Sequence, residues 1–191
     1  MTALSTNRRR RAIRSTLAVG AVSLGLAALT GCDAPTPSAH FTLNAGTESA
    51  EADHDCWAGG GDTLGAERGQ ECAASEDVPS FTAKPGETFR IGVDPEIAEG
   101  GGWIVLVNDL PLNEPYTSTY QTVPVDTITQ AAAQADSQVA QQGGQPTGGP
   151  ARVTLVKVVD GFDMAQIATI QDLYEQAEGV WGARISTDDE D

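Results

Sequence analysis

Short runs in which apolar and polar residues alternate set the strongest limit on the fold of this chain. In residues 88–93, Phe89, Ile91 and Val93 occupy every second position, so a strand would place all three on one face. Residues 103–107 are apolar throughout, which is typical of a strand buried on both faces, and residues 108–111 then supply the residues of a turn. This pattern predicts sheets, because an amphipathic helix needs apolar residues at intervals of three and four.

Further runs of this kind bring the expected total to about seven strands. They are residues 39–43, a short piece near Phe81, and residues 116–123, 152–159 and 180–185. We therefore predict a single all-β domain over residues 39–187, with the architecture of a small immunoglobulin-like β-sandwich and one or two helical insertions. Both Cys56 and Cys72 precede Trp103, so the antibody-type disulfide, which brackets its tryptophan, is not expected.

Residues 164–178 depart from the strand pattern and predict a helix. Asp163 and Gln166 form a capping-box-like start, and Gly179 stands where a helix would end. The apolar positions at helical spacing are Met164, Ile167, Ile170 and Tyr174.

Residues 126–142, rich in alanine and glutamine, predict a weaker helix. Its apolar side is thin and consists of Ile128, Ala132, Ala135 and Val139. Residues 143–150 are rich in glycine and proline. Because so little apolar surface is available to offset the cost of ordering this segment, we expect the insert at residues 124–150 to be flexible.

The first 31 residues have the features of a secretory signal peptide. A basic cluster, Arg8 to Arg11 with Arg14, precedes an uncharged and mostly apolar run at residues 17–30. This run is too short to cross a hydrocarbon core, which needs roughly 20 residues. A buried core helix is the alternative interpretation of the run, and both general-secretory and twin-arginine export remain open.

Residues 29–32 (LTGC) are similar to a bacterial lipobox, in which the thiol of the cysteine forms a thioether to diacylglycerol. We expect Cys32 to carry lipid and residues 32–38 to form a polar, proline-rich tether. The membrane partner is then lipid, through acylated Cys32, and the domain lies on the extracytoplasmic face of the cell membrane. Ordinary secretion with cleavage nearby is the alternative.

Cys56 and Cys72 form an even pair once Cys32 is lipidated, and a disulfide is the default in an oxidising compartment. The bond would stabilise the polar, glycine-rich loop at residues 44–80 by about 3 kcal/mol on the chain-entropy model. The competing hypothesis is a metal site in which His54 joins the two cysteines, with Asp53 or Asp55 nearby. No CxxC or HxxxH spacing supports it, and no metal or other cofactor is expected.

The charge balance excludes nucleic acid as a partner. Residues 1–31 hold five of the 11 basic residues and none of the 27 acidic ones, so their removal leaves a formal charge of −21. Such a chain repels phosphate. The tail at residues 188–191 is expected to be a solvated acidic end.

Candidate catalytic residues are few. The chain has no GxSxG motif and only two histidines, which disfavours a serine triad. Asp94 and Glu96, with Glu99, form the densest carboxylate group near a loop and could bind Ca²⁺ or act as an acid/base pair. A turn with solvated carboxylates is the simpler interpretation. Trp103 and Trp181 are expected in the core rather than on a ligand platform.

Four segments resemble a family of uncharacterised actinobacterial lipoproteins, domain of unknown function 2771. They are residues 89–98 (FRIGVDPEIA), 102–103 (GW), 114–116 (EPY) and, upstream, 32–37 (CDAPTP). The resemblance covers residues 32 to about 123, and residues 153–185 more loosely. It implies a secreted, lipid-anchored domain, and it implies no activity and no catalytic residues.

The sequence thus favours a non-enzymatic binding or scaffolding lipoprotein that presents a β-sandwich to the cell-wall space, where an envelope protein or the wall would be its partner. A small cell-wall-acting hydrolase that uses Asp94 and Glu96 is the second hypothesis. A metal- or solute-binding lipoprotein is the third.

Overall fold

The computed structural model describes residues 35–146 and 148–187. The signal peptide at residues 1–31, Cys32 and the acidic tail at residues 188–191 lie outside the described residues. In the described part, no helix has both the length and the apolar character needed to span a membrane.

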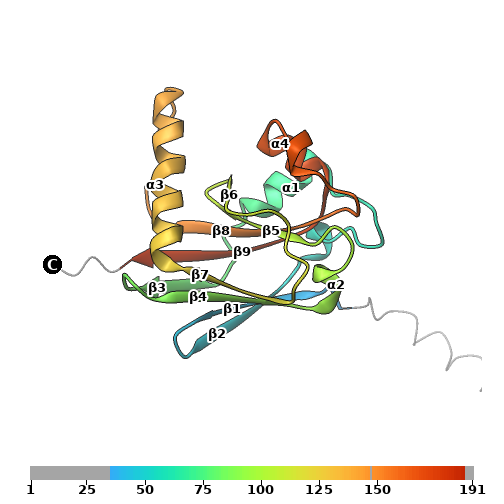
Figure 1. The fold of residues 1–191 in the computed structure, drawn as a ribbon, viewed down its shortest axis with the longest axis horizontal. Coiled ribbons are helices and arrows are strands. Elements are labelled where there is room, and N and C mark those ends of the chain that lie inside the picture. The colour runs from blue at the N-terminus through green and yellow to red at the C-terminus, as the bar shows by residue number, and fades with distance from the viewer. Residues whose placement is uncertain (1–34, 147, 188–191) are drawn as a thin grey trace, which may run out of the picture. The chain divides into compact units, whose positions relative to one another are not determined.

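Two β-sheets form the body of the domain (Figure 1). One sheet has four antiparallel strands, in the order β2 (Gly46–Glu51), β1 (Ser38–Leu43), β4 (Thr88–Val93) and β7 (Tyr120–Pro124). The other has five strands, in the order β3 (Ser80–Ala83), β9 (Ala177–Thr187), β8 (Ala151–Val158), β5 (Trp103–Val107) and β6 (Leu110–Pro111). All neighbours in the second sheet are antiparallel except β3 and β9, which are parallel. The predicted mostly β class is confirmed.

The inner faces of the two sheets share one apolar core. Phe89, Ile91 and Val93 are buried there, as their alternation predicts. Trp103 is fully buried, and its indole N–H donates to the Ser118 carbonyl at 2.8 Å. Trp181 is also buried and donates to the Pro37 carbonyl at 2.9 Å. The prediction that both tryptophans belong to the core is therefore confirmed.

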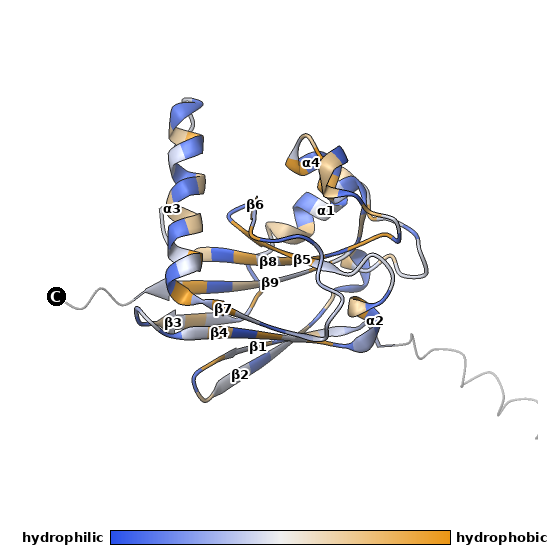
Figure 2. Cartoon of the chain, in the orientation of Figure 1, coloured by the Kyte–Doolittle hydropathy of each residue, from blue (hydrophilic) through white to orange (hydrophobic). Residues whose placement is uncertain are grey.

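A second core covers the outer face of the five-stranded sheet. Helices α1 (Ala66–Ala73) and α4 (Ile170–Glu175) pack on this face, on the side away from the four-stranded sheet (Figure 1). Ile104 and Leu106 of β5 point into this second core, whereas Trp103, Val105 and Val107 point into the first. Apolar residues accordingly recur along β5 and β8 in Figure 2. The fully apolar run at residues 103–107 is explained by this burial on both faces.

The predicted helix at residues 164–178 is wrong in its extent. A 3-10 turn (Met164–Gln166) and the short helix α4 share this stretch, and β9 begins at Ala177. Thr169 and Asp172 form a capping box at the start of α4. A new helix therefore begins at this point, although the apolar spacing suggested one continuous helix. Gly179 lies inside β9, where a Cβ atom would come within 2.6 Å of the Trp57 and Trp181 rings. Close packing, rather than helix termination, requires glycine there.

The alanine- and glutamine-rich segment forms helix α3 (Val125–Gln141). Its first half closes one end of the core, and its buried residues are Val125, Ile128, Ala131 and Ala135. Val139, expected on the apolar side, is 37% exposed. The helix runs past the edge of the sheets (Figure 1), so the residues after Ala135 have no core to bury.

Two strands, β2 and β6, were not predicted from the sequence. β2 is an edge strand of exposed polar residues, and β6 has only two residues, so neither shows an apolar alternation. One remaining element, α2 (Pro95–Ala98), is a single turn that follows β4. A 3-10 turn (His54–Cys56) precedes α1.

Candidate functional site

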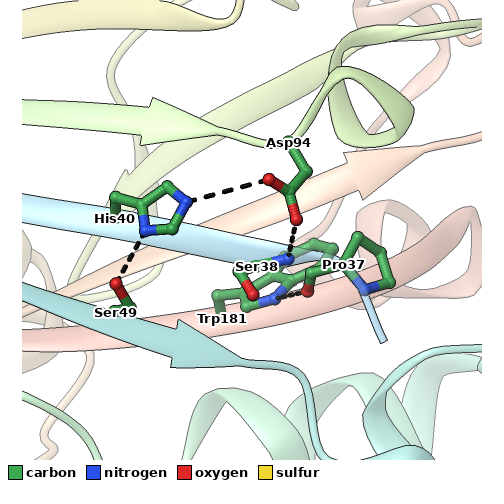
Figure 3. A network of polar contacts seen from close by, with 6 residues as sticks. All are labelled: Pro37, Ser38, His40, Ser49, Asp94 and Trp181. Carbon is green, nitrogen blue, oxygen red and sulfur yellow. Dashed lines mark hydrogen bonds and ion pairs between the residues drawn. The ribbon is translucent and has the colours of Figure 1, made fainter. Parts of the chain in front are cut away.

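The two carboxylates singled out by sequence lie in different surroundings. Asp94 lies between β4 and α2, and its Oδ2 accepts a hydrogen bond from the Ser38 backbone N–H at 2.7 Å (Figure 3). Glu96 is exposed on α2. Neither residue lines the cleft described below or the cavity beside the disulfide. Asp94 thus has a structural task, which is to hold the start of β1 against the end of β4.

Asp94 also belongs to a polar network on the outer face of the four-stranded sheet (Figure 3). His40 Nδ1 lies 2.7 Å from Ser49 Oγ, and His40 Nε2 lies 3.7 Å from Asp94 Oδ1. The three residue types are those of a serine triad. However, His40 and Asp94 are 43% and 44% exposed, and 3.7 Å is too long for a hydrogen bond. The network cross-links β2, β1 and β4 on a solvated surface.

The same face carries other polar side chains in register. His40 is paired with Ser49 on β2 and with Gly92 on β4, and Gly92 is paired with Tyr120 on β7. Paired residues project to the same side of a sheet, so His40 and Tyr120 flank a position without a side chain, about 10 Å apart. Tyr120 is 52% exposed. The adjacent row holds Thr47, Thr42, Arg90 and Thr122. We call these two rows the open face.

The predicted disulfide is confirmed. Cys56 and Cys72 are bonded, with their Cα atoms 5.7 Å apart, and the bond ties the turn at residues 54–56 to α1. Trp57 extends this attachment, because its ring lies 5.8 Å from that of Trp181. A metal site with both cysteines as ligands is excluded, since their sulfurs are consumed by the bond. The described residues also include no group of three or more His, Cys, Asp or Glu side chains that could hold a metal ion.

A cleft of about 280 Å³ lies between the second half of α3 and the turn that joins β5 to β6. Two arginines line it, Arg152 on β8 and Arg184 on β9, and they are directly opposite each other in the sheet. The Arg152 Nε atom is buried, and no hydrogen-bond partner for it lies among the described residues. A buried donor without a partner costs about 1–3 kcal/mol, so this arginine calls for an explanation.

Acidic side chains surround the two arginines. Glu76, Asp109 and Asp136 also line the cleft, and Arg184 Nη2 lies 3.5 Å from Glu76 Oε1. Asp109 Oδ1 accepts a hydrogen bond of 2.9 Å from the Tyr174 hydroxyl. Burial, and then the nearby Asp109 carboxylate, raise the pKa of Tyr174 far above its ordinary value. The phenol is therefore a neutral donor at every physiological pH, and it positions Asp109.

The cleft was not predicted from the sequence. The local pattern shows Arg152 only as one polar residue at the start of a β-branched run, and Arg184 lies 32 positions later in the chain. The available signal was that both arginines fall on the face of their strands that is apolar further along, at Val156 and Val180. Only the register of β8 with β9 brings them together.

A buried ion pair was missed for the same reason. Lys157 Nζ lies 3.2 Å from Glu178 Oε2, and the two side chains are only 7% and 8% exposed. Lys157 Nζ also donates to the Glu99 carbonyl at 2.9 Å. The pair joins β8, β9 and the loop after α2 at one end of the inter-sheet core.

No protein-family model, curated protein or solved structure matches this chain.

Proposed function

We propose that this protein is a cell-envelope lipoprotein, anchored through acylated Cys32 on the extracytoplasmic face of the membrane, that binds a partner in the cell-wall space without catalysis. The basic and apolar N-terminal segments and the LTGC sequence at residues 29–32 support the anchor. Membership of domain of unknown function 2771, expected from residues 32–37 and 89–98, is part of this proposal and would imply the same localisation. We further propose that the two packed sheets belong to the immunoglobulin-like class of sandwiches, with the disulfide outside the sheets.

One observation carries the binding role: the two sheets are covered unequally. Helices α1 and α4 cover the outer face of the five-stranded sheet, whereas in the described part of the chain the rows of His40 and Arg90 are left to solvent. On this face Tyr120 is half exposed, and His40 contacts Ser49 in a polar network that is open to solvent. The open face is therefore the partner surface that we propose.

The partner that best suits the open face is an uncharged, hydroxyl-rich glycan of the wall. Ser49, Thr42, Thr47 and Thr122 offer hydroxyl groups, and the Tyr120 ring offers an apolar plane with a polar tip. Gly92 leaves the backbone between His40 and Tyr120 without a side chain, which gives a sugar ring room to approach. A strongly acidic domain would repel an anionic polymer, so a neutral glycan is favoured.

Tyr120→Ala is expected to weaken binding of the protein to insoluble wall glycan at least tenfold in a sedimentation assay. The melting temperature should stay unchanged, because Tyr120 is half exposed and surface changes stay within about 0.5 kcal/mol. Tyr120→Phe is the matched control and should retain most binding, since it keeps the ring. Equal sedimentation of Tyr120→Ala and the native protein would refute the assignment of this face.

Cys32→Ala is expected to abolish lipid attachment, because no other thiol is available at the end of the apolar run. Metabolic labelling with an alkyne fatty acid should mark the native protein and leave the variant unlabelled, and the variant should persist as an uncleaved precursor or be released. Ser38→Ala, which keeps Cys32, is the control and should label normally. Continued labelling of Cys32→Ala, with normal processing, would contradict the anchor.

A further inference from the structure

The two arginines of the cleft share a cross-strand position that needs compensation. Residues directly opposite in an antiparallel pair have Cβ atoms about 5 Å apart, and like charges there repel. Arg184 has a partner in Glu76, but that carboxylate is 88% exposed and is therefore well solvated. Arg152 keeps a buried Nε without a partner among the described residues. The cleft thus presents two guanidinium groups side by side, one with an unpartnered Nε and the other paired only with an exposed carboxylate.

We propose that this cleft binds a small zwitterion, a molecule that carries a carboxylate and an ammonium group, such as a short peptide with free ends. Arg152 and Arg184 would take the carboxylate, because the planar guanidinium matches two carboxylate oxygens. The acidic side chains at Glu76, Asp109 and Asp136 would face the ammonium group.

The balance of charges favours a zwitterion over a simple anion. Two arginines and three carboxylates line the cleft, so its formal charge is already negative. A phosphate ion would add to that excess, whereas a zwitterion adds no net charge and meets both signs. The Tyr174 hydroxyl bond to Asp109 keeps one of these carboxylates in place before the ligand arrives.

The shape of the cleft is consistent with a ligand of this size. Its volume of about 280 Å³ lies near the lower end of small-molecule pockets, which suits one or two amino-acid units. Ala135 and Val139 of α3 provide an apolar wall, which suits small aliphatic side chains. The exposure of Val139, unexplained by the core, would fall when such a ligand binds.

This site is separate from the open face and from the lipid anchor. Its residues include parts of α3, the turn after β5, the start of β8 and the end of β9. The open face belongs to the four-stranded sheet. Failure of glycan binding or of lipidation would therefore leave this inference intact.

Calorimetric titration of the full chain in detergent provides the test. The dipeptide alanyl-alanine should bind, and N-acetyl-alanyl-alanine and alanyl-alanine amide, which each lack one charge, should bind at least tenfold more weakly. Inorganic phosphate should also bind more weakly than the dipeptide. The inference is overturned if the dipeptide gives no heat of binding, if either blocked derivative binds equally well, or if phosphate binds as tightly and marks a plain anion site.

Variants locate the site. Arg152→Gln and Arg184→Gln should each weaken dipeptide binding at least tenfold, whereas Arg68→Gln, on the exposed side of α1 and paired with Glu71, should leave it unchanged. If Arg152→Gln does not fold, Arg184→Gln still decides the matter, because its side chain is partly exposed. Native binding by Arg184→Gln, or an equal loss in Arg68→Gln, would place the ligand elsewhere.

Discussion

Replacement of Trp103 by alanine is expected to lower the free energy of unfolding by about 3–5 kcal/mol. The side chain is fully buried in the inter-sheet core, and its ring lies 5.1 Å from that of Tyr116. Removal of a tryptophan from a packed core costs about 3–5 kcal/mol, of the roughly 5–15 kcal/mol that stabilises a domain. The substitution also leaves the Ser118 carbonyl without its indole donor.

Urea denaturation followed by circular dichroism measures this loss. Tyr120→Ala, which removes an aromatic side chain from the surface, is the matched control and should change the free energy of unfolding by no more than about 0.5 kcal/mol. If Trp103→Ala unfolds at the same urea concentration as the native protein, the core described here is incorrect.

The second large effect is expected at the buried ion pair. Lys157→Met leaves the Glu178 carboxylate buried without its cation, which should lower the free energy of unfolding by about 3–5 kcal/mol. The double variant Lys157→Met with Glu178→Leu removes both charges and should recover most of this loss, because well-packed apolar residues often replace a buried pair at little cost.

A double-mutant cycle at pH 7 separates these contributions. The exposed pair Arg68 and Glu71 on α1 is the matched control, and its single variants should each change stability by less than about 1 kcal/mol. Additive losses in the Lys157 and Glu178 cycle would show that the two side chains do not interact in the folded protein.

Local sequence patterns were sufficient for the strands that bury one or both faces. Phe89, Ile91 and Val93 alternate because one face of β4 meets the core and the other meets water. The same physics makes β2 hard to find, since an edge strand exposed on both faces has no reason to alternate. The pairing of Cys56 with Cys72 could also be predicted, because only two thiols remain once Cys32 is assigned to the lipid.

The helical segments show where local patterns mislead. Met164, Ile167, Ile170 and Tyr174 have helical spacing, yet a 3-10 turn and the separate short helix α4 share this stretch over the five-stranded sheet. The spacing of these apolar residues reflects which of them face the sheet. It does not require the backbone between them to be a continuous helix. The capping box of Thr169 and Asp172 is a local signal that a separate helix begins there.

The sequence by itself determined the buried strands, the tryptophan core and the disulfide, because each depends on residues that are close in the chain or few in number, and the lipid anchor stays a prediction from sequence. Only the tertiary structure decided which polar residues meet. Arg152 meets Arg184, Lys157 meets Glu178, and His40 meets Ser49 and Asp94 through strand pairing and sheet order. Register depends on the burial of whole faces and on turn geometry, so these contacts follow from interactions between distant segments.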